Sequence, residues 1–185
     1  MHTALAMVEL RAMVRSMSAD QFRQQLGPLA LVEQRADLVL RTAPERESGE
    51  VGPTSLTQPE LIMAKMLLLA IETADLHVTT LPPMRSHDEI TVGRQPDSDL
   101  VIDHDSVSKR HAVLRWDDRM EQCTLEDLGS TNGTFVNTDQ PITREVVLED
   151  GDIVSFGDLA FWFLYTGTLY ARLLNPRVSV RPPPR

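Results

Sequence analysis

The sequence predicts a mainly β fold, an antiparallel β-sandwich that follows an α-helical N-terminal region. Two observations carry this prediction. From residue 76 onward, short runs of β-prone residues alternate with turn residues, which is typical of a sandwich or barrel. Before residue 75, apolar residues recur at helical spacing instead. We therefore divide the 185 residues into a helical region (1–75), a β domain (76–175) and an extended Pro/Arg tail (176–185).

The N-terminal region is predicted to contain three helical segments and a loop-like stretch at 43–59. The first segment is indicated by apolar residues at helical spacing within residues 1–19, namely Leu5, Val8 and Met13. The second begins at a capping box made by Ser18 and Gln21 and ends at Gly27-Pro28.

The third predicted helix runs from a capping box at Thr57 and Glu60 to about Thr73. Its nearly continuous apolar face, which includes Ile62 and Met66, must be buried against something. Packing on the β domain or on the other helices is one alternative. Dimerisation or docking of a partner is the other, so homo-oligomerisation through the N-terminal helices is an open expectation.

The β domain is predicted to contain ten strands. In the run from Leu159 to Leu164 both faces are apolar, which indicates a central strand. Turns are expected at Asp150-Gly151 and Gly157-Asp158, where glycine can adopt a positive φ. The expected strands are 76–81, 89–92, 100–102, 112–116, 122–126, 134–136, 146–148, 153–156, 159–164 and 168–173.

Composition excludes several classes of protein. The net charge is −9, and residues 76–175 contain 8 basic and 17 acidic residues, so we expect no nucleic-acid partner. The most apolar run, residues 61–71, is much shorter than the ~20 residues of a membrane span. A single cysteine, Cys123, cannot form an intramolecular disulfide and is expected in the core. We expect a cytoplasmic protein without a membrane anchor.

Three short motifs lie in order at the predicted strand ends. They are Gly93-Arg94, then Ser108-Lys109-Arg110-His111, then the turn 129–134 with the sequence Gly-Ser-Thr-Asn-Gly-Thr. Together with Asp99-Leu100-Val101-Ile102 and Gly151-Asp152-Ile153, they resemble the forkhead-associated (FHA) domain over residues 76–173. The resemblance implies a sandwich of two antiparallel sheets whose loops bind phosphothreonine in a partner protein.

The resemblance also implies a role for each polar residue of the motifs. Arg94 matches the arginine that contacts the phosphate, and Ser108 matches the serine that donates to a phosphate oxygen. Lys109 would add a point charge. Thr131 matches the position that closes the phosphate pocket. Asn132 matches the residue whose amide holds the main chain of the peptide, because an amide both donates and accepts.

Four further residues are expected to support the site. Gly93 lets the chain turn before the arginine, and His111 braces the binding loops. Gly133 and Asn137 shape and follow the turn. A serine three residues before a histidine does not make a nucleophile and base, and no oxyanion hole is recognisable, so we expect no enzyme.

No cofactor or metal is expected either. The five histidines lack metal-ligand spacing, and the turn 129–134 lacks the Gly-Lys-Ser/Thr ending of a nucleotide-binding loop. Selectivity is a separate hypothesis. Asp105 and Ser106 occupy the loop that in the family helps to read the peptide after the phosphothreonine. A carboxylate there should disfavour acidic peptides and favour neutral or basic ones.

The function that follows is a phosphothreonine-dependent adaptor or regulator in Ser/Thr kinase signalling. Its partner would be a phosphothreonine-containing kinase substrate. One alternative is a phosphate-independent scaffold or assembly component built on the same fold. Another is a self-inhibited switch in which Thr42, Thr54 or Thr57 is phosphorylated and occupies the protein's own pocket.

Overall fold

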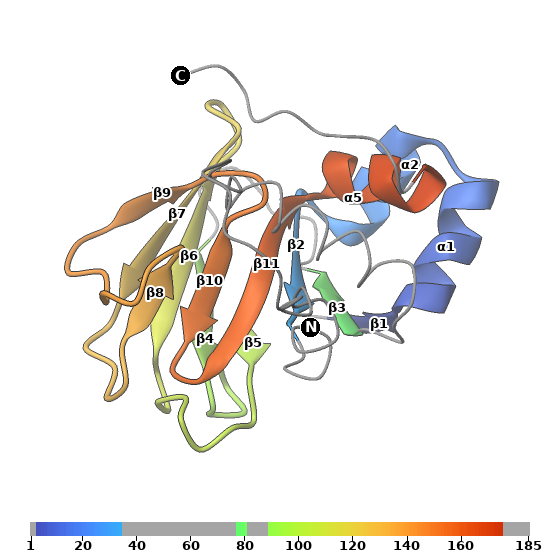
Figure 1. Ribbon diagram of the computed structural model, residues 1–185. Coiled ribbons are helices and arrows are strands. Elements are labelled where there is room, and N and C mark those ends of the chain that lie inside the picture. The colour runs from blue at the N-terminus through green and yellow to red at the C-terminus, as the bar shows by residue number, and fades with distance from the viewer. Residues whose placement is uncertain (1–2, 35–76, 81–88, 176–185) are drawn as a thin grey trace, which may run out of the picture.

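Two β-sheets face each other and three helices cover the outer surface of one of them, as the computed structural model shows for residues 3–34, 77–80 and 89–175 (Figure 1). The strands are β1 (Thr3–Ala6), β2 (Leu29–Glu33), β3 (His77–Thr80), β4 (Glu89–Gly93), β5 (Leu100–Val101), β6 (Ala112–Asp117), β7 (Gln122–Asp127), β8 (Thr134–Val136), β9 (Val146–Leu148), β10 (Ile153–Phe156) and β11 (Leu159–Tyr165). The helices are α1 (Met7–Ser16), α2 (Ala19–Leu26) and α5 (Thr166–Leu174).

The six-stranded sheet has the order β1-β3-β2-β11-β10-β8 and is antiparallel throughout. The five-stranded sheet has the order β5-β4-β6-β7-β9 and is antiparallel except for the short β4–β5 pair. The predicted mainly β sandwich is confirmed.

The six-stranded sheet has a core on each of its faces. Phe161 and Phe163 of β11 point into the core between the two sheets, where Cys123 is also fully buried. Trp162 and Leu164, which alternate with them, pack against the helices. Apolar side chains on both faces of β11 thus pack against other parts of the protein. This confirms the prediction that the strand is central.

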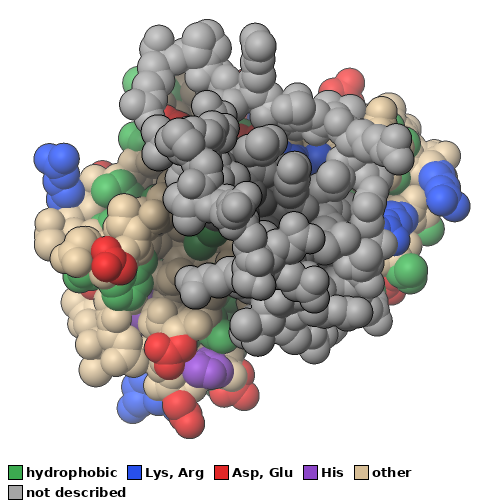
Figure 2. Space-filling view, in the orientation of Figure 1, with side chains coloured by type: hydrophobic (Ala, Val, Ile, Leu, Met, Phe, Trp, Pro, Cys, Tyr) green, Lys and Arg blue, Asp and Glu red, His purple; other side chains and the backbone are tan. Residues whose placement is uncertain are grey.

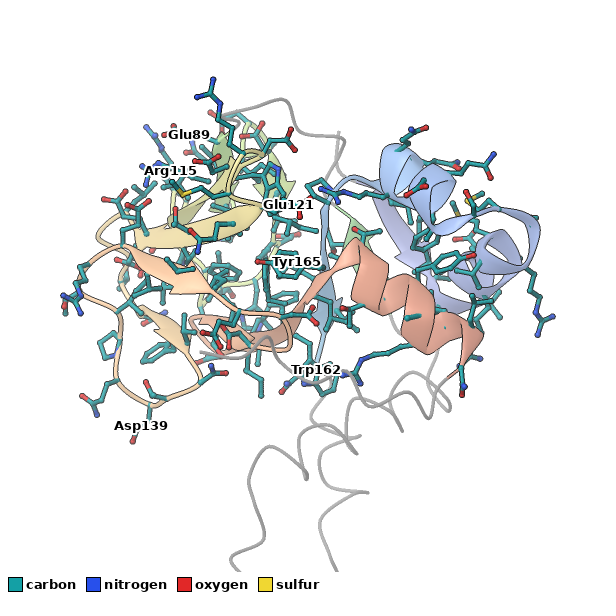
Figure 3. All side chains as sticks on the ribbon, turned by 90° about the horizontal axis from the view of Figure 1, so that it is seen from above. Glu89, Arg115, Glu121, Asp139, Trp162 and Tyr165 are labelled. Carbon is teal, nitrogen blue, oxygen red and sulfur yellow. The ribbon has the colours of Figure 1, made fainter. Side chains whose placement is uncertain are left out.

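Helix α2 forms as the sequence predicts. The Ser18 hydroxyl accepts a hydrogen bond from the N–H of Gln21, and the Gln21 side chain accepts one from the N–H of Ser18. The helix ends where Gly27 adopts a φ of 82°. Arg23 of this helix then reaches Glu121 on the β6–β7 hairpin, with Nη2 at 3.1 Å from Oε1. Figure 3 shows Glu121 between the sandwich and the helices.

Helix α1 is also present, and of the three apolar residues that indicated this segment, Leu5 and Met13 pack against the helical core while Val8 does not. Met7, Leu10 and Val14 are buried, whereas Val8 is 67% exposed. Residues 3–6 form strand β1, so Leu5 precedes the helix. The buried residues follow the i, i+3, i+7 spacing of a helix that begins at residue 7.

Two predictions of secondary structure were wrong. The run 168–173 was expected to be a strand because of its Thr, Leu and Tyr residues, but it lies in helix α5, which buries Leu169 and Leu173 against the helical core. No strand was expected before residue 76, but β1 and β2 both join the six-stranded sheet. Strand β2 pairs with β11, so the sheet crosses the boundary that we drew at 75/76.

Several expectations lie outside the described residues. They concern the helix from Thr57 to Thr73, the loop-like stretch 43–59, Thr42 and Thr54, and the tail 176–185. Among the residues that the structure describes, no helix is long and apolar enough to cross a membrane.

The outer face of the five-stranded sheet is charged. Arg115 of β6 contacts three carboxylates: its Nε lies 2.7 Å from Glu89 Oε1, and its Nη1 lies 2.6 Å from Glu126 and 2.9 Å from Glu145. Figure 3 shows Arg115 beside Glu89, on the side of the sandwich away from the helices. These contacts, led by the hydrogen bond to Glu89, raise the pKa of Arg115. Its guanidinium is therefore occupied and not a candidate ligand for an anion.

Candidate functional site

The loops that follow β4, β5, β7 and β10 meet at one end of the sandwich, the lower end in Figure 1. Figure 2 shows acidic, basic and histidine side chains together at this end. A cavity of about 380 Å³ opens between the loops. All five residues that the resemblance identified as ligand contacts lie on its wall. The lining residues are Arg94, Asp105, Ser106, Val107, Ser108, Lys109, Arg110, Thr131 and Asn132.

Arg94 is placed by the close approach of two backbone segments. The N–H of Arg94 donates to the carbonyl of Ser108 at 3.0 Å, and its side-chain Nε donates to the carbonyl of Val107 at 3.3 Å. A Cβ on Gly93 would lie 2.2 Å from the carbonyl oxygen of Lys109. Gly93 is therefore needed because the loop passes directly over it, and no positive φ is involved. The Arg94 side chain lines the cavity.

Ser108 and Thr131 come from different loops and meet at the cavity wall. The N–H of Thr131 donates to Ser108 Oγ at 3.0 Å, and the Ser108 hydroxyl lies 3.4 Å from Thr131 Oγ1. Both hydroxyls can turn toward an anion in the cavity, since a hydroxyl rotates to suit its acceptor.

The turn 129–134 is held by Asp127, which the sequence analysis missed. One carboxylate oxygen accepts the N–H groups of Gly129 and Ser130, and the other accepts the hydroxyls of Ser130 and Thr134. Burial opposes ionisation of this carboxyl group, but the four hydrogen bonds prevail and lower the pKa of Asp127. An aspartate two residues before a Gly-Ser turn was the signal that could have identified it.

His111 connects the two loops that contain Ser108 and Gly133. Its Nδ1 accepts the N–H of Ser108 at 3.0 Å, which leaves Nε2–H to donate to the carbonyl of Gly133 at 3.1 Å. Burial lowers the pKa of His111, although the Gly133 carbonyl and the charge of Asp127 oppose this. The histidine is therefore neutral. It contacts the backbone of Ser108 and not the hydroxyl, so the two residues are not arranged as a nucleophile and base.

Gly133 and Asn137 lie in the turn and just beyond it, away from the cavity wall. Gly133 has a φ of 85° and Asn137 a φ of 58°, a backbone region that L-residues other than asparagine and aspartate seldom adopt. The Asn137 side chain accepts the N–H of Ile153 and donates to Asp152, which fixes the end of β8 against β10.

The loop 103–108 is fixed through Ser106, which is 7% exposed. The Ser106 hydroxyl accepts the N–H of Asp158 at 3.0 Å, and its carbonyl accepts the side-chain amide of Asn132 at 2.8 Å. A Cβ on Gly157 would lie 2.5 Å from the Ser106 carbonyl oxygen. The Asn132 amide therefore already uses one donor inside the protein and keeps its oxygen and its second N–H for other partners.

The charges at the cavity are mixed. Arg94, Lys109 and Arg110 bring three cations to a domain that is otherwise acidic, and Arg110 was not among the predicted ligand contacts. Its position beside Lys109 in the Ser-Lys-Arg-His motif was the available signal. One acid is close: Asp105 Oδ1 lies 3.7 Å from Arg94 Nη1, and the Asp105 side chain is fully exposed. Within the described residues, no cluster of side chains could hold a metal ion.

This arrangement defines a β-sandwich with a polar cavity of net positive charge between the loops at one end. Residues 90–157 match the family model of the FHA domain. This part of the chain is an FHA domain.

Curated relatives match the same region. The glycogen accumulation regulator GarA of Mycobacterium tuberculosis is 40% identical over 74 residues, which are 40% of this chain and 43% of GarA. The oxoglutarate dehydrogenase inhibitor of Corynebacterium diphtheriae is 42% identical over 74 residues, 40% of this chain and 49% of the inhibitor. The matches thus span less than half the length of these relatives.

Solved structures are also similar to this chain. The structure of Mycobacterium tuberculosis EmbR in complex with a low-affinity phosphopeptide is 36% identical and covers 41% of this chain and 19% of EmbR, with a TM-score of 0.37. The FHA domain of a Chlamydia trachomatis protein is 27% identical and covers 50% of this chain and 85% of its own, with a TM-score of 0.41.

Proposed function

We propose that this protein binds phosphothreonine in a segment of a partner protein and acts as a non-catalytic regulator or adaptor in Ser/Thr kinase signalling. The observation that carries the proposal is the convergence of three groups on one cavity of about 380 Å³. They are the guanidinium of Arg94 and the hydroxyls of Ser108 and Thr131. They come from three different loops, which follow β4, β5 and β7.

The chemistry of these groups matches the chemistry of a phosphate ester. A phosphothreonine carries close to two negative charges and three acceptor oxygens. Arg94 offers Nη donors whose ion pair with Asp105 is too long for a hydrogen bond, and the two hydroxyls add neutral donors. Lys109 adds a charge that forms no ion pair with another described residue. The carbonyl and second N–H of the Asn132 amide suit the main chain of an extended peptide.

The relatives support a regulatory role. Two proteins that match this region are named as a regulator of glycogen accumulation and as an inhibitor of oxoglutarate dehydrogenase. Regulators act by binding, and among the groups that line the cavity none is arranged as a nucleophile with its base. We infer that this chain likewise acts on a partner protein through binding. Which partner it regulates is set by the sequence around the phosphothreonine.

The competing reading is a scaffold that uses the fold without binding phosphate. Such a protein would not require Arg94 at the cavity, where the Val107 carbonyl holds its Nε and its Nη groups face outward. The retention of Arg94 and Ser108 on one wall favours the phosphate-binding reading.

Titration with a phosphothreonine peptide library tests the proposal, with phosphoserine and unmodified peptides as references. We expect binding that requires the phosphate and prefers threonine. Arg94→Ala should weaken it by about 2 kcal/mol or more, roughly 30-fold, because hydrogen bonds to charged groups contribute ~1.5–3 kcal/mol. Melting temperature should be nearly unchanged.

Arg144→Ala is the matched control, because Arg144 is exposed and does not line the cavity. It removes the same charge and should leave the affinity within about twofold, as expected of a distant and screened charge. Equal affinity for phosphorylated and unmodified peptides would favour the scaffold reading.

A further inference from the structure

We propose that Asp105 is an internal counter-ion of the binding site and a determinant of its specificity. In the free protein it pairs with Arg94. When a phosphate takes Arg94, Asp105 is released and selects peptides that carry a basic residue beside the phosphothreonine. This inference rests on the proposed function and adds to it the chemical class of the preferred partner segment.

Asp105 and Arg94 form an ion pair at the cavity. Asp105 Oδ1 lies 3.7 Å from Arg94 Nη1, an ion pair too long for a hydrogen bond. Arg94 Nε is held by the Val107 carbonyl, so the guanidinium presents its Nη groups to the cavity and to Asp105 alike. An incoming phosphate and the Asp105 carboxylate therefore compete for the same donors.

The backbone at Asp105 is fixed. The next residue, Ser106, is buried. The Ser106 hydroxyl accepts the N–H of Asp158, and the Ser106 carbonyl accepts the Asn132 amide. The carbonyl also lies against Gly157, where a Cβ would come within 2.5 Å. Only the side chain of Asp105 can swing away from Arg94. Its charge stays at the mouth of the cavity after the phosphate has entered.

Phosphate binding changes the charge balance around Asp105. A bound phosphate brings close to two negative charges to the cavity and removes the cation that Asp105 had as a partner. Because the Asp105 side chain is fully exposed, a lysine or arginine of the peptide can reach it. Such a peptide restores an opposite charge to Asp105, while a neutral peptide leaves it unpaired and an acidic peptide adds repulsion.

The experiment compares two variants that remove the same charge from the same loop, Asp105→Asn and Asp103→Asn. Asp103 is exposed and does not line the cavity. The ligands are neutral phosphothreonine peptides in which one position at a time, on either side of the phosphothreonine, is Lys or Gln. Affinities are measured by titration calorimetry at low and at physiological salt, and folding is checked by thermal melting.

We expect wild type to prefer Lys to Gln at one or more positions, by about three- to fivefold, which is the range measured for exposed ion pairs. Asp105→Asn should abolish that preference and bind the all-Gln peptide about threefold more tightly, with the gain reduced at higher salt. Asp103→Asn should keep the preference and change affinity by less than about twofold.

Two outcomes overturn the inference while leaving the proposed function intact. One is phosphopeptide binding in which Asp105→Asn and Asp103→Asn behave alike. The other is a wild-type protein that binds the phosphopeptides but shows no preference for Lys at any position. If wild type and both variants bind no phosphothreonine peptide at all, the proposed function fails, and the inference fails with it.

Discussion

Two groups of residues build the loop end of the sandwich, and they differ in burial and in their partners. The loop frame comprises Gly93, Ser106, His111, Asp127, Gly133 and Thr134. The charged rim comprises Arg94, Asp105, Lys109 and Arg110. Members of the frame bond to backbone groups or lie against backbone, as His111 and Asp127 show. Rim side chains are exposed in whole or in part, and the only ion pair described among them is that of Arg94 with Asp105.

The shape of the cavity and its charge are therefore supplied by separate residues. The frame sets where the loops lie without facing the cavity, apart from Ser106. The rim supplies charge and contributes little to the fold, because exposed charges are worth little to stability. Variants of the frame should therefore lower the free energy of unfolding, while variants of the rim should change affinity alone. Changes at Asp127, Gly93 and His111 test this separation.

Asp127→Ala should be the most damaging change in the frame. It removes the acceptor of two N–H groups and two hydroxyls, including that of the fully buried Thr134. We expect the free energy of unfolding to fall by about 4 kcal/mol, since each hydrogen bond to a charged group contributes ~1.5–3 kcal/mol and the turn recovers some with water. Urea denaturation measures it. Asp139→Ala, at the exposed position labelled in Figure 3, should cost less than about 0.5 kcal/mol.

Gly93→Ala should come next, because its Cβ would meet the Lys109 carbonyl oxygen at 2.2 Å and one of the two backbone segments must move. We expect a loss of about 3 kcal/mol, the upper end of the cost of overpacking. Phosphopeptide affinity should also fall, because Arg94 is the next residue. Gly167→Ala is the matched control. It lies in helix α5 with open space around its Cβ, and it should stabilise the protein by up to about 1 kcal/mol. Equal effects of the two changes would contradict the close approach at Gly93.

The smallest effect concerns pH and His111. The pKa of this histidine is lowered in the fold, chiefly by burial, so the unfolded chain binds a proton more readily. Its contribution to stability is therefore complete above the unfolded pKa of about 6.5 and is lost as pH falls below it. The slope attributable to His111 should be at most about 1.4 kcal/mol per pH unit. Denaturation curves between pH 5 and pH 7 should show it in wild type and not in His111→Asn. NMR titration of the ring would contradict this explanation if it gave a raised pKa.

The sandwich could be predicted well from the sequence because its loops contain residues that favour turns by themselves. Ser-Thr-Asn-Gly and Gly-Asp need no distant partner to form turns, and Gly133, Gly151 and Gly157 all adopt a positive φ. The capping box at Ser18 is equally local. The motifs also identified five residues that line one cavity, because loops at the same end of a sandwich converge.

What the sequence could not predict depends on partners far along the chain. A short apolar run such as residues 29–33 fits a helix or a strand, and only pairing with β11 decides between them. Helix α5 was predicted to be a strand because its residues are β-prone. Leu169 and Leu173 are at helical spacing, but only the fold shows that this side faces the helical core. Asp127 and Arg110 were missed because their importance depends on where the turn and the cavity lie. The contact of Asp105 with Arg94 joins two loops whose approach no local pattern encodes.

Strand β2 has a consequence for how the protein can be divided. Leu29 and Leu31 fill the space between the two sheets, and Ala30 and Val32 face the helices. The segment matched by the family, residues 90–157, includes neither β2 nor β11. If that segment were excised, the core between the sheets would lose the side chains of β2 and β11. The edge of β10 that pairs with β11 would be left with unpaired backbone groups. Strand β2 is thus a structural part of the sandwich, and a shortened form that is meant to fold must retain it.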